Sequence, residues 1–135
     1  MASRPHSPSS LCLVDWEERS RDAAELAARV GEPGVDQRLL ALLLDSEDTA
    51  VTVAGAELLL LRRDMPGLRL YARAFSLAGE NTRDHLGDCL YNEAGTLWAD
   101  VRRLLSTLAT DDDREVREGA AVLVRHMTEQ ENHHQ

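Results

Sequence analysis

The chain has 135 residues, which is enough for one domain with its own hydrophobic core. Its 24 acidic and 15 basic residues give a net charge of −9, which argues against a nucleic-acid-binding protein and fits a basic protein partner. The longest apolar run, Leu39–Leu44, is far too short to span a membrane. Two cysteines without a secretion signal indicate reduced thiols and a cytoplasmic protein.

Every one of the 15 basic residues is arginine, and lysine is absent. One explanation is a GC-rich, bacterial coding sequence. The other is selection for the paired hydrogen bonds that a planar guanidinium makes. Composition leaves both explanations open.

The apolar residues recur with the period of amphipathic helices, and no segment alternates with the period of two that a strand requires. We therefore expect an all-α fold, divided by glycine, proline and acidic turns into seven helices. These helices are expected at about 15–30, 35–44, 49–62, 68–78, 82–94, 97–109 and 113–127. Residues 1–10 are expected to form a disordered arm, residues 11–128 a single domain, and residues 129–135 a frayed tail.

One segment of the chain is repeated. Each copy is an acidic turn followed by a helix that has a valine at its first buried position and small residues one turn later. The first copy is Asp45–Leu61, with Val51, Ala54, Leu58 and Leu61 expected on the helical pattern. The second copy is Thr110–Met127, with Val116, Gly119, Ala120, Leu123 and Met127 on the same pattern. Such internal repeats are typical of stacked helical hairpins.

The stretch Thr110–Leu123 resembles the second half of a HEAT repeat, in which an acidic turn is followed by Val-Arg, small residues and leucine. Asp45–Leu61 resembles a weaker copy, with Thr52 where arginine is expected. Asn81–Glu93 resembles a degenerate copy, in which Asp84 and His85 stand where the valine should be.

The resemblance implies a short right-handed α-solenoid of about three HEAT-like helical hairpins plus an N-terminal cap helix. The hairpins pair the second helix with the third, the fourth with the fifth, and the sixth with the seventh. In such repeats the second helix of each pair lines a concave face that binds a protein partner. The resemblance thus indicates a class of function and names no partner.

The expected fifth helix departs from the repeat pattern, and such departures often mark binding sites. Its candidate partner-binding residues are Asp84, His85, Asp88, Tyr91 and Asn92. They are expected to form an acidic, hydrogen-bonding strip on the concave face. Tyr91 is the kind of amphipathic side chain that is enriched at protein interfaces. The alternative is that this repeat degenerated without selection for binding.

The same helix allows a second interpretation. His85 and Cys89 lie four residues apart and share a helix face, and Asp84 and Asp88 share the adjacent face. These groups could begin a zinc site or activate a cysteine nucleophile. A structural zinc site needs four ligands, and no second His/Cys cluster supplies them. We therefore expect no metal and no cofactor, with Cys89 packed in the core.

The acidic turns at Asp45–Asp48 and Asp111–Asp113 are expected to cap the helices that follow them. Together they are expected to lie along one edge of the molecule, where a row of acids would steer a basic protein.

No glycine-rich phosphate loop, Ser-His-Asp order or Cys-x-x-Cys motif is present, so we do not expect an enzyme. The sequence predicts a bacterial, non-catalytic interaction module that binds a basic protein through an acidic concave face. An immunity-type protein that inhibits its partner is one concrete form of this function. The alternatives are a metal- or small-ligand-binding helical-repeat enzyme and a subunit of a structural homo-oligomer. Whether the protein is a monomer or a homodimer stays open.

Overall fold

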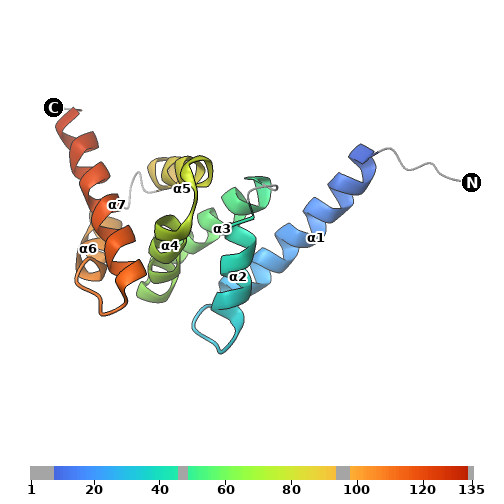
Figure 1. The fold of residues 1–135 in the computed structure, drawn as a ribbon, viewed down its shortest axis with the longest axis horizontal. Helices are drawn as coiled ribbons and strands as arrows, with labels where there is room; N and C mark the ends of the chain where they lie inside the picture. The colour runs from blue at the N-terminus through green and yellow to red at the C-terminus, as the bar shows by residue number, and fades with distance from the viewer. Residues whose placement is uncertain (1–7, 46–48, 94–97, 134–135) are drawn as a thin grey trace, which may run out of the picture.

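A computed structural model describes residues 8–45, 49–93 and 98–133, and side chains at 17–45, 49–91 and 99–130. The described residues form seven helices joined by short turns and contain no strand, which confirms the expected all-α fold (Figure 1). The helices are α1 (Pro8–Ala28), α2 (Val35–Leu43), α3 (Thr49–Arg62), α4 (Met65–Leu77), α5 (Glu80–Glu93), α6 (Trp98–Leu108) and α7 (Arg114–His133).

Several helices begin earlier or end later than the sequence pattern indicated. Helix α1 begins at Pro8, and α7 continues through the polar residues after Met127 to His133. Helix α4 begins at Met65, although Pro66 suggested a break there. Proline is tolerated in the first turn of a helix, and Asp64 caps this one by accepting a hydrogen bond from the Gly67 amide at 2.9 Å.

Leucine, alanine and valine side chains from all seven helices build one continuous core, in which Tyr71 and Phe75 are the largest fully buried residues. The repeated segments contribute to it as expected at Val51, Val116, Ala120, Leu123 and Met127. The first copy was assigned the wrong face near its end. Leu59 and Leu60 are buried, whereas Leu61 is 51% exposed.

Helices α3 and α4 lie at the centre of the packing. Helix α3 packs against α1, α2, α4 and α5, and α4 packs against α2, α5, α6 and most extensively α7. In Figure 1 the chain accordingly runs from α1 at one end to α6 and α7 at the other, with α3 and α4 between them. None of the helices in the described ranges is both long and apolar enough to cross a bilayer.

One packing relationship differs from a regular row of hairpins. The resemblance places the third, fifth and seventh helices side by side, and α3 does pack against α5. Helix α7, however, packs against α4 and makes hardly any contact with α5 in the part of the chain that the structure describes. Helices α5 and α7 therefore flank α4 without closing on each other (Figure 1).

Candidate functional site

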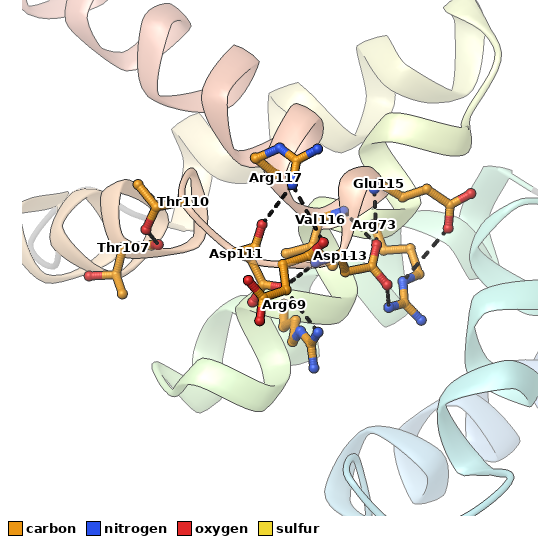
Figure 2. Close-up of polar contacts among 10 residues, drawn as sticks. Arg69, Arg73, Thr107, Thr110, Asp111, Asp113, Glu115, Val116 and Arg117 are labelled. Atoms are coloured by element: carbon orange, nitrogen blue, oxygen red, sulfur yellow. Dashed lines mark hydrogen bonds and ion pairs between the residues drawn. The ribbon is translucent and has the colours of Figure 1, made fainter.

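The triple-aspartate turn is a structural element that holds α7 onto α4 (Figure 2). The Asp113 carboxylate accepts hydrogen bonds from the amides of Glu115 at 2.9 Å and Val116 at 3.2 Å, and so caps α7. Its other oxygen pairs with Arg73 of α4. These amides, foremost that of Val116, lower the pKa of Asp113, and the Arg73 charge lowers it further against the effect of burial.

Two further acids of the expected edge, Asp111 and Asp45, also bind groups of the chain itself. Asp111 accepts hydrogen bonds from the Asp113 amide at 2.9 Å and from Arg69 at 3.0 Å. At the other acidic turn, the side chain of Asp45 pairs with Arg19 of α1. Among the described acids of the expected edge, Asp45, Asp111 and Asp113 are thus committed to contacts within the chain, whereas Glu47 and Asp48 lie outside the described residues.

A cleft of about 450 Å³ opens between α5 and α7, above the end of α4. Its lining residues are Phe75, Arg83, Asp84, Gly87, Asp88, Tyr91 and His126. A second hollow of about 350 Å³ shares Tyr91 and His126 with it and adds Glu129 and Gln130. The cleft exists because α7 packs against α4 instead of α5.

Aromatic rings and a cation form one wall of the cleft. The ring of His126 meets the ring of Phe75 edge-on, with 6.2 Å between centroids and an interplanar angle of 84°. The guanidinium of Arg83 lies 5.1 Å from the Phe75 ring centroid. Arg83 is held there because its Nε and Nη2 donate hydrogen bonds to the carbonyls of Phe75 at 3.1 Å and Ser76 at 3.2 Å, in the last turn of α4.

Carboxylates line the α5 side. The buried positions of α5 are Thr82, Leu86, Cys89 and Leu90, which leaves Asp84, Asp88 and Tyr91 on the outer face. Tyr71 of α4 fixes this orientation by donating a hydrogen bond from its hydroxyl to the Leu86 carbonyl, and burial raises the pKa of Tyr71 well above its usual value.

The carboxylates of Asp84 and Asp88 on α5 are available to a partner. Both Asp84 and Asp88 are exposed, and no arginine, histidine or amino nitrogen of the described residues lies within 4.0 Å of either one. Tyr91 is 37% exposed beside them. The cleft therefore offers two carboxylates without an ion-pair partner among the described residues, next to aromatic surface, and they outnumber the one cation of the lining, Arg83, so the site suits a cationic side chain.

The structure brings three of the five sequence-derived candidates to this cleft: Asp84, Asp88 and Tyr91. His85 is half-buried and is not among the lining residues, and the side chain of Asn92 lies outside the described residues. Sequence reasoning missed Phe75, Arg83 and His126. These residues come from three helices, and no spacing along the chain indicates that they meet.

The alternative metal or thiol site is divided between two sides of α5. Cys89 is buried, and its Sγ lies 3.9 Å from the Val53 carbonyl of α3, whereas Asp84 and Asp88 line the cleft toward α7. Within the described ranges, no three His, Cys, Asp or Glu side chains lie close enough together to share a metal ion.

Comparison of the chain with protein-family models, with curated proteins and with solved structures finds no match in any of the three.

Proposed function

We propose that this protein is a non-catalytic interaction module that binds a basic protein through the cleft between α5 and α7. Inhibition of the bound protein, as by a bacterial immunity-type protein, is one concrete form of this function. The proposal includes a HEAT-like, right-handed solenoid of helical hairpins as the scaffold. The packing of α2 on α3 and of α3 on α5 supports that scaffold.

The observation that carries the proposal is the contrast between two sets of aspartates. Asp45, Asp111 and Asp113 each pair with an arginine of the chain itself. Asp84 and Asp88 have no such partner among the described residues. A net charge of −9 attracts a basic protein over a distance, and unpaired carboxylates in a cleft give it a place to bind.

The second supporting feature is the aromatic surface beside those carboxylates. Tyr91 is one of only three large hydrophobic residues that are exposed in the described part of the chain. Aromatic anchors next to charged groups are a common composition of interface centres. Asp84, Asp88 and Tyr91 follow one another at intervals of four and three residues, so they form a continuous stripe along α5.

The test is affinity purification of the tagged protein from its own cells. The test variant is Asp84→Arg with Asp88→Arg. The matched control is Glu18→Arg with Glu25→Arg, because these two exposed acids lie on α1, far from the cleft, and the net charge changes by the same amount. Mass spectrometry identifies the bound proteins.

We expect one stoichiometric basic protein with the wild type and with the α1 control, and its loss from the cleft variant. Equal recovery with the cleft variant would overturn the assignment of the site. Equal loss from both variants would show that only net charge matters, and would overturn it as well.

A further inference from the structure

The Arg83 side chain shows how a guanidinium binds in this cleft. The guanidinium of Arg83 lies 5.1 Å from the centroid of the Phe75 ring, while its nitrogens donate to two backbone carbonyls. A guanidinium can satisfy both requirements together, because it is planar, presents several donors in one plane and stacks on aromatic faces.

The rest of the cleft offers a comparable combination of aromatic rings and oxygen acceptors, with carboxylates in place of backbone carbonyls. Tyr91 and His126 line both adjoining hollows from opposite helices, so their rings border the space between α5 and α7. The carboxylates of Asp84 and Asp88 are one helical turn apart on the same side of α5. Carboxylate oxygens accept paired hydrogen bonds from a guanidinium, and the rings supply surfaces on which it stacks.

The geometry points to an arginine side chain of the basic partner as the group that enters this cleft. This inference rests on the proposed function and narrows it, because it names the side chain that the cleft recognises. Lysine carries the same charge, but its ammonium is compact and strongly hydrated and cannot bind in the same plane to two acceptors. Lysine is therefore attracted to Asp84, Asp88 and the Tyr91 ring as a point charge, but it cannot combine flat stacking on Tyr91 with paired hydrogen bonds to a carboxylate.

The test uses two fluorescein-labelled dodecapeptides, one of alternating arginine and serine and one of alternating lysine and serine. Their binding to the full chain is followed by fluorescence anisotropy at physiological salt. We expect the arginine peptide to bind roughly fivefold more tightly, which corresponds to about 1 kcal/mol from planar stacking and paired hydrogen bonds that lysine cannot make.

Two variants separate charge from stacking. Asp84→Asn with Asp88→Asn should weaken both peptides, whereas the control Glu18→Gln with Glu25→Gln removes the same charge from α1 and should leave both nearly unchanged. Tyr91→Leu keeps the charges and the bulk, so we expect both peptides to bind but the preference for arginine to fall to less than twofold. Circular dichroism establishes that each variant is folded.

Equal affinity of the wild type for the two peptides would overturn the arginine inference and leave the proposed binding of a basic protein intact. The inference is also overturned if neither peptide binds. The proposed function itself fails on a different result, namely recovery of a partner that ignores charge reversal of Asp84 and Asp88.

Discussion

Gly119 of α7 lies directly against the backbone of Ala72 in α4. A Cβ atom at Gly119 would lie 2.9 Å from the carbonyl carbon of Ala72 and closer still to its oxygen. No side chain can be accommodated there, so the small residue allows α7 to approach α4 closely. This approach sets the position of α7, and with it the opening toward α5.

We expect Gly119→Ala to destabilise the protein by about 2 kcal/mol or more, because rigid backbone must move to admit the methyl group. The control is Gly87→Ala in α5, where a Cβ meets nothing within 4 Å. That change should leave the free energy of unfolding equal or higher, because alanine favours helix over glycine by up to about 1 kcal/mol. Urea denaturation measures both; an unaffected Gly119→Ala variant would contradict the close packing of α4 and α7.

Asp113 has two roles, and two substitutions separate them. Asp113→Ala removes the helix cap and the ion pair with Arg73, and should cost about 1–2 kcal/mol of the free energy of unfolding. Asp113→Asn keeps a capping side chain and should cost less. Asp112→Ala is the matched control, since the side chain of this exposed neighbour makes no hydrogen bond or ion pair among the described residues. A larger loss at Asp112 than at Asp113 would contradict the capping arrangement.

The same residue makes stability depend on pH. The folded state lowers the pKa of Asp113 from its model-compound value of 3.8, so the folded chain binds this proton less readily than the unfolded chain. The stabilisation is present at neutral pH and is lost as the pH falls through the lowered pKa. We expect the stability difference between wild type and Asp113→Asn to shrink between pH 7 and pH 3, measured by denaturation at each pH. A difference that grows on acidification would contradict the lowered pKa.

Arg62 joins the ends of α3 and α1. Its Nη1 donates to the carbonyls of Ala27 at 2.9 Å and Ala28 at 3.3 Å, and its Nη2 pairs with Asp64 at 2.9 Å. Lysine cannot reproduce this planar set of donors, so Arg62→Lys should cost about 1 kcal/mol. The adjacent Arg63, which is exposed and makes no such contact among the described residues, provides the control Arg63→Lys. Equal melting temperatures for the two variants would show that the guanidinium geometry at Arg62 is unimportant.

The internal repeat predicted local structure well because its residues act locally. Thr52 and Arg117 stand at the same position of the two copies, and both donate to a backbone carbonyl that precedes their helix, at the end of α2 for Thr52 and in the turn before α7 for Arg117. Thr52 Oγ1 donates to the Leu43 carbonyl at 3.0 Å, and Arg117 donates to the Asp111 carbonyl at 3.0 Å. The sequence showed the substitution of threonine for arginine, and the structure shows that both residues perform the same task.

The cleft could be predicted only on its α5 side. Asp84, Asp88 and Tyr91 lie on one helix, so their spacing alone places them on one face. Phe75 and His126 meet them because α7 packs against α4, and that choice depends on the fit of Gly119 to the Ala72 backbone. Helical periodicity identifies Gly119 as a small residue on the buried face, but it does not identify the helix that the residue contacts.

Hydrogen exchange of the protein, free and bound to its basic partner, tests the location of the binding site most directly. We expect slower amide exchange on binding in α5 from Arg83 to Tyr91 and in α7 from His126 to Gln130, with α1 and α2 unchanged. Protection confined to α1 and α2, with unchanged exchange along α5, would contradict it.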